Sequence, residues 1–369
     1  MFGEHNYEVL TSSRDGLQRQ IDHFGSKQRH DTDGYNIIPL GYCTYRNRSD
    51  DGKFAFNINT ISETAIVSKF YPVFRFVDAN STFMAEFLNS SPRVKRKLSV
   101  LAVGTSQVVL SFEALKAAKF DLPCKDEQDK IAAFLEVLNA RIEKQRALVV
   151  ALKKYKRGFL RAYFMSDDWK RHGTWRKCKL GACCSKIGSG KTPRGGSSVY
   201  VDRGVMFLRS QNVLWGMLDI SDVSFIDEVT NSTMQSTEVR SGDVLLNITG
   251  ASIGRSCIYT LNGRANVNQH VCIIRLSQEG KERILPEFLL QQILSDRIQQ
   301  QVMDCQNGGS REGLNFQQIA DFNIVIPEME EQRKFCGMMS AFDQKAYDEE
   351  MALNALFSLR TSLMQQLFI

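Results

Sequence analysis

The sequence predicts a mixed α/β protein made of two copies of one domain, each ending in a long helix. Three observations support this prediction. Residues 104–164 align without a gap onto residues 308–368, at an offset of 204 (308 minus 104). Both copies contain apolar residues in the 4-3 spacing of a coiled-coil seam, and short apolar runs alternating with turn residues precede them. A period of this length indicates a duplicated domain, because solenoid repeats are only about 20–50 residues long.

The two long helices are predicted from matched start signals and matched seams. Pro123 and Pro327 correspond, and each is followed by acidic residues that suit the positive end of a helix dipole. Both seams are interrupted at one corresponding position, Gln145 in the first copy and Glu349 in the second. One such stripe is equally typical of a helix packed on its own domain, but two in matched register favour pairing with each other. The seam residues are Ile131, Leu135, Leu138, Ile142, Val149, Leu152 and Phe159, then Phe335, Met339, Phe342, Ala346, Leu353, Leu356 and Leu363.

The segments before the helices read as strands and turns. Between residues 200 and 275, short apolar runs are separated by Gly, Asn, Asp and Ser, and residues 36–76 are comparable. At an offset of 201 (242 minus 41), Gly41 falls on Gly242. The first copy lacks an equivalent of residues 180 to about 204, so we expect it to start partway through the fold. The predicted domains are 1–125, 126–166 (first helix), 167–327 and 328–369 (second helix).

Composition excludes several function classes. Hydrophobic residues make up 43% and charged residues 24% of 369, as in ordinary globular proteins. No apolar run is long enough to span a membrane and the first residues are not those of a secretory signal, so we expect a cytoplasmic protein without a membrane partner. The nine cysteines contain no C-x-x-C pair, which fits reduced thiols rather than disulfides or zinc. A net charge of +6 permits nucleic-acid binding.

Catalytic motifs do not stand out in the sequence. There is no H-E-x-x-H, no Gly-x-Ser-x-Gly, no Asn-Pro-Pro-Tyr methyltransferase motif and no convincing acidic cluster for a metal-dependent nuclease. Residues 188–192 resemble the end of a P-loop, but Ser185 replaces its first glycine and Pro193 disturbs the helix that must come after it. A surface turn carrying Lys191 and Arg194 is the better interpretation. We therefore expect no metal site and no cofactor bound by this chain.

Polar and basic residues of the predicted loops form a candidate DNA-binding set. Arg and Lys can bind guanine, Asn and Gln can pair with adenine, and Ser and Thr can hold phosphates. Taken singly, each of these residues is better explained as solvated surface, so the hypothesis rests on the group. The candidates in the second domain are Lys191, Thr192, Arg194, Arg209, Ser210, Gln211, Asn212, Asn268, Gln269, His270, Ser310 and Arg311. Those in the first domain are Arg14, Arg19, Arg46, Arg48, Lys69, Ser106 and Gln107.

From Leu10 to Phe368 the sequence resembles the DNA-specificity subunits of Type I restriction-modification systems. The resemblance implies two target-recognition domains, each reading one half of a split DNA site, and two long helices packed as an antiparallel coiled coil between them. The segments that carry it are 154–160, 179–193, 207–212, 242–254 and the two Pro-x3-Glu-Gln helix starts.

The resemblance also implies partners. This chain would be non-catalytic, and methyltransferase (M) subunits and an endonuclease/translocase (R) subunit would methylate adenine and cut DNA. S-adenosylmethionine, ATP and Mg would then be bound by those subunits. The M subunits would dock on the helices and nearby surfaces, for which the candidate residues are Tyr155, Phe159, Leu160, Leu356 and Leu363.

Two other function classes stay open at this point. A coiled-coil scaffold without DNA readout predicts no DNA retention and tolerance of alanine at Lys191, Arg194 and Gln211. A self-sufficient nuclease predicts DNA cleavage with magnesium alone, and the lack of a metal-ligand cluster counts against it.

Overall fold

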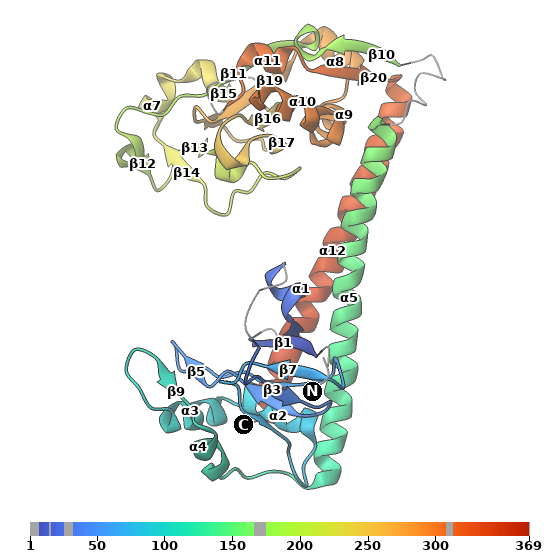
Figure 1. Cartoon of the computed structure of the whole chain (residues 1–369). Coiled ribbons are helices and arrows are strands. Elements are labelled where there is room, and N and C mark those ends of the chain that lie inside the picture. The colour runs from blue at the N-terminus through green and yellow to red at the C-terminus, as the bar shows by residue number, and fades with distance from the viewer. Residues whose placement is uncertain (1–6, 15, 26–31, 166–174, 308–312, 369) are drawn as a thin grey trace. The chain divides into compact units, whose positions relative to one another are not determined.

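The computed structural model describes residues 7–14, 16–25, 32–165, 175–307 and 313–368 (Figure 1). The chain divides into two compact units. Unit 1 comprises Met1–Leu148 and Glu349–Ile369, and unit 2 comprises Val149–Asp348. The long helices α5 (Lys125–Met165) and α12 (Met329–Leu367) each contribute to both units. The predicted mixed α/β fold with two long helices is thereby confirmed.

Unit 1 contains two small sheets and a two-stranded ribbon. The strand orders are β2-β1-β7-β3, β6-β4-β8 and β5-β9. Strand β1 is parallel to β7, and the other pairings are antiparallel. Besides parts of the long helices, its elements are β1 (Glu8–Ser13), β2 (Gly16–Arg19), α1 (Gln20–Phe24), β3 (Asn36–Ile38), β4 (Cys43–Tyr45), β5 (Arg48–Ser49), β6 (Phe56–Ile58), β7 (Ala65–Val67), β8 (Val73–Phe74), α2 (Ser81–Ser90), α3 (Pro92–Leu101), β9 (Val108–Val109) and α4 (Phe112–Ala117).

Unit 2 repeats this plan with larger sheets. Its strand orders are β12-β14-β13-β18-β15, β11-β19-β16-β17 and β10-β20. The strands are β10 (Arg176–Lys179), β11 (Cys184–Ser189), β12 (Tyr200–Val201), β13 (Val205–Leu208), β14 (Ser224–Ile226), β15 (Glu238–Val239), β16 (Val244–Asn247), β17 (Ser256–Ile258), β18 (Ala265–Val267), β19 (Val271–Leu276) and β20 (Asn323–Ile326). The helices are η1 (Leu180–Cys183), η2 (Gly196–Val199), η3 (Ser210–Asn212), α7 (Glu228–Ser232), η4 (Gln235–Thr237), η5 (Gly250–Ser252), α8 (Gln278–Arg283), α9 (Pro286–Leu294), α10 (Asp296–Asn307) and α11 (Phe316–Ala320).

The two units share one topology. Parallel strands β13 and β18 of unit 2 correspond to β1 and β7 of unit 1. Strand β16 lies between β17 and β19, as β4 lies between β6 and β8. The described residues of unit 1 contain no counterpart of β10, β11 or β12.

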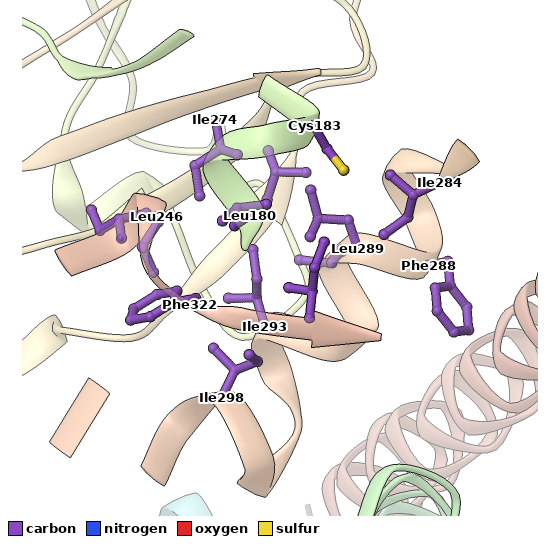
Figure 2. Packing of buried hydrophobic residues seen from close by; sticks show 14 of the residues in the cluster. Leu180, Cys183, Leu246, Ile274, Ile284, Phe288, Leu289, Ile293, Ile298 and Phe322 are labelled. Atoms are coloured by element: carbon purple, nitrogen blue, oxygen red, sulfur yellow. The ribbon is translucent and has the colours of Figure 1, made fainter. Parts of the chain in front are cut away.

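The main core of unit 2 lies between the β11-β19-β16-β17 sheet and helices α9 and α10. Figure 2 shows Leu180 of η1, Ile293 of α9 and Phe322 grouped in this cluster, and each is almost fully buried. Burying one such side chain contributes about 1.5–3 kcal/mol. Helix α9 packs directly on β16 and β17 (Figure 1). The continuous apolar run Val271–Ile274 is buried on both faces, which explains why it does not alternate with polar residues.

The long helices run antiparallel within each unit. In unit 1, Gln145 of α5 contacts Glu349 and Asn139 contacts Arg360, so the residue numbers rise along one helix as they fall along the other. In unit 2, Phe159 stacks on Phe335, with ring centroids 6.1 Å apart. The predicted seam residues Leu135, Leu138, Ile142, Val149, Phe335 and Met339 are all buried.

Each long helix is fastened at its start by a buried glutamine. In unit 1, Gln128 accepts from the amide of Asn80 at 3.0 Å and donates to the Pro123 carbonyl at 2.9 Å. In unit 2, Gln332 accepts from the amide of Leu285 at 2.9 Å and donates to the Pro327 carbonyl at 2.8 Å. These bonds tie the amide at the start of α2 or α9 to the proline before α5 or α12. The Pro-x3-Glu-Gln starts therefore have a structural cause.

Candidate nucleic-acid interface

The candidate residues of unit 2 converge because β13 and β18 are parallel. Their carboxyl ends lie at one sheet edge, with Leu208 opposite Val267. The segments that leave this edge are 209–212 and 268–270. Strand β11 ends beside the start of β19, with Ser189 opposite Cys272, and this brings the loop 190–195 to the same place. Three segments far apart in sequence thus form one polar edge.

Gly190 lets the loop after β11 approach β18 closely. A Cβ atom at this position would lie 1.6 Å from the Val267 carbonyl oxygen, so only glycine fits. The Gly190 amide donates to the Asn268 carbonyl at 3.1 Å. The loop leads into the short 3-10 helix η2 rather than an α-helix, so the segment lacks the helix start that a P-loop requires. Its exposed residues Lys191 and Arg194 lie on the resulting turn.

Four side chains form a hydrogen-bonded chain across this edge. The Thr192 hydroxyl donates to Gln269 Oε1, and Gln269 Nε2 lies 3.0 Å from His270 Nε2. His270 Nδ1 lies 2.5 Å from the Thr249 hydroxyl. The chain links loops after β11, β16 and β18 and restricts the rotamers of Gln269 and His270. Ordering these side chains before a ligand arrives lowers the entropic cost of binding.

Asp222 orients two further candidates. Its carboxylate accepts from Gln211 Nε2 at 2.8 Å and lies 3.9 Å from Arg209 Nη2. The Arg209 guanidinium also lies over the Tyr200 ring, 5.9 Å from the centroid. An arginine and a glutamine, the side chains that bind guanine and adenine edges, are therefore held side by side.

Other predicted residues serve the fold of this edge instead. Asn212 is buried, accepts from the Arg209 amide and donates to the carbonyls of Asp219 and Asp222. Its amide is thus committed to the turn. Asn268 is buried and accepts from the His270 amide, and the Ser210 carbonyl accepts from Asn247. Ser310 and Arg311 lie outside the described residues.

The equivalent edge of unit 1 carries arginines. Arg14 follows β1, while Arg46 and Arg48 lie in and beside the turn between β4 and β5, and all three line a cavity of about 390 Å³. Lys69 follows β7, and the Lys69 ammonium and the Arg48 guanidinium both lie over the Phe70 ring, within 5.7 and 5.4 Å of its centroid. The prediction singled these four cations out, and the structure brings them to one edge.

The remaining candidates of unit 1 are placed differently. Gln107 donates to Asp50 at 3.0 Å, and Asp50 lines the same cavity, so Gln107 lies at its rim. Ser106 is exposed beside it. Arg19 pairs with Glu8 on the β1-β2 hairpin, at the amino end of β1 and away from the edge.

Asp222, Thr249 and Tyr200 were not predicted from the sequence. Each acts on a candidate residue that is at least nine positions away, so no local pattern marks it. Among the described residues, no group of three His, Cys, Asp or Glu side chains is placed to hold a metal ion. No described helix is long and apolar enough to cross a membrane.

The helix residues proposed for partner contacts differ in exposure. Tyr155 is exposed, whereas Phe159 and Leu160 pack partly against the unit 2 core. Leu356 and Leu363 are half-buried. Exposed apolar side chains recur at the 204-residue offset: Phe134 corresponds to Met338, and Tyr155 corresponds to Leu359.

The fold defines a duplicated mixed α/β protein with one polar edge in each unit. Residues 4–151 and 207–355 each match the family described as Type I restriction modification DNA specificity domain. The chain belongs to this family, and the two matches keep the register of the repeat.

Known relatives agree with this assignment. The chain is 22% identical over 240 residues to the Type I restriction enzyme MjaVIII specificity subunit of Methanocaldococcus jannaschii, covering 61% of this chain and 55% of the relative. It thus spans about half the length of that relative. Among solved structures, the Type I restriction-modification S subunit from M. genitalium matches 99% of this chain and 89% of its own, with a TM-score of 0.57 and 16% identity. A structure from work on assembly and conformational transition of the type I R-M system matches 91% and 84%, with a TM-score of 0.56 and 17% identity. At these identities the structures support the fold.

Proposed function

We propose that this chain is the sequence-specific DNA-binding subunit of a Type I restriction-modification complex and recognises a bipartite DNA target. One observation supports the proposal: in both units, the carboxyl edge of a parallel strand pair gathers side chains of the types that commonly contact DNA. In unit 2 this edge presents Lys191, Arg209 and Gln211, and in unit 1 it presents Arg14 and Arg48. Two edges of this kind suit two half-sites.

The two edges suggest different modes of contact. Unit 1 offers mainly cations, which favour phosphate contacts, whereas unit 2 adds oriented amide groups that suit base edges. The helices α5 and α12 would set the length of the spacer DNA that separates the two half-sites. The domain boundaries would be those predicted from the sequence. Affinity would come largely from phosphate contacts and would fall steeply with salt.

Catalysis would belong to the partners. Methyltransferase subunits with S-adenosylmethionine would methylate adenine, and an endonuclease/translocase subunit with ATP and Mg would restrict. The recurring exposed pairs Phe134/Met338 and Tyr155/Leu359 are suitable docking positions for two identical M subunits. This chain would be non-catalytic and would work in the cytoplasm.

The decisive experiment maps N6-methyladenine in the host genome with and without this gene. The proposal is supported if deletion of the gene removes methylation at a two-part sequence motif and complementation restores it. An unchanged methylome refutes it. A complementing gene with Gln211→Ala should shift or abolish only the half of the motif that unit 2 reads.

The coiled-coil scaffold is separated from this function by DNA retention. The assembled complex with alanine at Lys191, Arg194 and Gln211 should lose specific binding if the chain reads DNA. A scaffold would tolerate all three changes.

A further inference from the structure

Three side chains that are hydrogen-bonded to one another in unit 1 have counterparts in unit 2 whose hydrogen bonds differ. Glu86 is the sixth residue of α2. Arg360 of α12 donates from Nη2 to both carboxylate oxygens of Glu86, at 2.7 and 2.8 Å, and from Nε to Asn139 Oδ1 at 2.8 Å. The guanidinium therefore satisfies two acceptors at once, which its planar fork allows.

In unit 2 the corresponding residues are Gln291, the sixth residue of α9, with Lys156 and Asp343. Lys156 pairs with the carboxylate of Asp343. Gln291 is 8% exposed, and its Oε1 atom is buried without a hydrogen-bond partner among the described residues. An unsatisfied buried acceptor costs about 1–3 kcal/mol. The acceptor that Arg360 satisfies in unit 1 thus lacks a donor in unit 2.

Gln291 lines a cavity of about 450 Å³ within unit 2. The wall is mainly apolar, with Leu218 and Met339 among its residues, and the charged residues on it are the acids Glu287 and Asp343. The cavity beside Glu86 in unit 1 is lined instead by cations, namely Arg14, Lys53, Lys95 and Arg360. A cationic group is therefore favoured in the unit 2 cavity and disfavoured in its counterpart.

Apolar side chains surround the mouth of the unit 2 cavity. Met217 and Ile220 line it and remain 57% and 46% exposed, and the neighbouring Trp215 is 56% exposed. Trp215 and Met217 belong to the turn that is closed by a bridge between Val213 and Leu218, and Ile220 follows this turn. Exposed apolar residues gathered at one place are typical of interaction surfaces, and contacts with another protein are among these.

We propose that the unit 2 cavity receives an arginine side chain from a partner polypeptide. Its guanidinium donates to Gln291 Oε1 and pairs with Glu287, while its aliphatic stem lies against Met217 and Leu218. Apolar residues beside that arginine in the partner cover Trp215. Arginine is preferred to lysine because one planar fork can reach both acceptors, as Arg360 does in unit 1. The inference does not depend on DNA reading by this chain.

The test uses the full chain labelled with carbon-13 at the methionine methyl groups. Met217 and Met339 line the cavity, and the buried Met84 of unit 1 serves as an internal control for folding. The probes are capped arginine, capped citrulline as its uncharged analogue, and a capped Leu-Arg-Leu tripeptide. We expect capped arginine to shift the Met217 and Met339 signals saturably at millimolar concentration, without moving Met84. Citrulline should bind more weakly, and the tripeptide more tightly.

Two variants make the test specific. Gln291→Leu removes the acceptor and should weaken arginine binding roughly tenfold. The double variant Lys156→Arg with Gln291→Glu recreates the unit 1 ion pair and should abolish probe binding by filling the site. The proposal is overturned if Met217 and Met339 do not respond, if citrulline binds as well as arginine, or if Gln291→Leu binds normally. Equal affinity of capped arginine and the tripeptide would contradict a polypeptide partner.

Discussion

Gln145 and Glu349, which occupy the same position in the two copies of the repeat, are bonded to each other. Gln145 Nε2 donates to the Glu349 backbone carbonyl at 3.0 Å and to the Glu349 carboxylate. Where two helices of equivalent sequence pair in antiparallel fashion, one residue faces its own counterpart, and Gln145 and Glu349 are this pair. The interruptions of the two apolar seams are therefore the two halves of one polar contact.

The first prediction concerns this contact. Gln145→Leu should lower the free energy of unfolding by about 1–3 kcal/mol, because Gln145 is 3% exposed and the substitution removes both of its hydrogen bonds to Glu349. Chemical denaturation measures the change. Gln365→Leu, an exposed position on α12, is the matched control and should change stability by less than about 0.5 kcal/mol. Equal effects of the two substitutions would contradict a structural role for Gln145.

The two glutamines that fasten the helix starts should contribute unequally to the stability of their units. Among the described residues, Gln332 makes three hydrogen bonds, to the Leu285 amide and to the carbonyls of Arg283 and Pro327, whereas Gln128 makes two. Replacing Gln332 with leucine should therefore destabilise unit 2 more than the same change at Gln128 destabilises unit 1, by about 1 kcal/mol. Hydrogen exchange followed by mass spectrometry can read both units in one sample. A larger effect at Gln128 would show that these bonds do not decide local stability.

Lys191 should contribute a phosphate contact. Lys191→Ala in the assembled complex should weaken binding to specific and non-specific DNA alike and reduce the slope of log K against log salt by about 0.9. Lys281→Ala on α8, which removes the same charge away from the edge, is the control. If both variants lower the slope equally, Lys191 acts only through net charge.

Replacing Asp222 should strengthen non-specific DNA binding and weaken discrimination between bases. Asp222→Ala removes an anion from the DNA-facing edge, so non-specific binding should tighten. It also frees Gln211 and Arg209, so discrimination against a wrong base should fall by about 1–3 kcal/mol. Competition binding with single-base variants of the target measures both quantities. Glu279→Ala on α8 controls for charge, and unchanged discrimination in Asp222→Ala would refute the positioning role.

Cys178 and Cys183 should form a disulfide under oxidation. Their sulfurs lie 3.8 Å apart, and the hydrogen bond from Cys178, together with the nearby Arg283, lowers the pKa of Cys183 to about 7. The reactive thiolate should therefore accumulate as pH rises through about 7, so diamide should oxidise the pair faster at pH 8 than at pH 6.

Peptide mapping should then show the loss of two hydrogens from that pair. Cys257, whose pKa burial raises to about 12, should stay reduced. A pH-independent rate would contradict the assignment of the thiolate.

The duplication, the two long helices and their seam were predictable because they depend on local information. Periodic apolar residues and a constant offset can be read from the sequence without knowledge of the tertiary contacts. Leu135, Ile142 and Phe335 are buried as their spacing predicts. The family resemblance rested instead on particular sequence segments, namely 154–160, 179–193, 207–212, 242–254 and the two Pro-x3-Glu-Gln helix starts.

Only the tertiary structure shows which polar residues are available to contact a ligand and which are committed to the fold. Gln211 and Asn212 are neighbours with similar chemistry, yet Asn212 is buried in its turn while Gln211 is exposed and held by Asp222. Likewise, only packing shows that Arg360 satisfies Glu86 whereas Gln291 lacks a donor among the described residues. The physical reason is that a hydrogen bond between residues distant in sequence depends on how strands and helices meet, and no local pattern records that geometry.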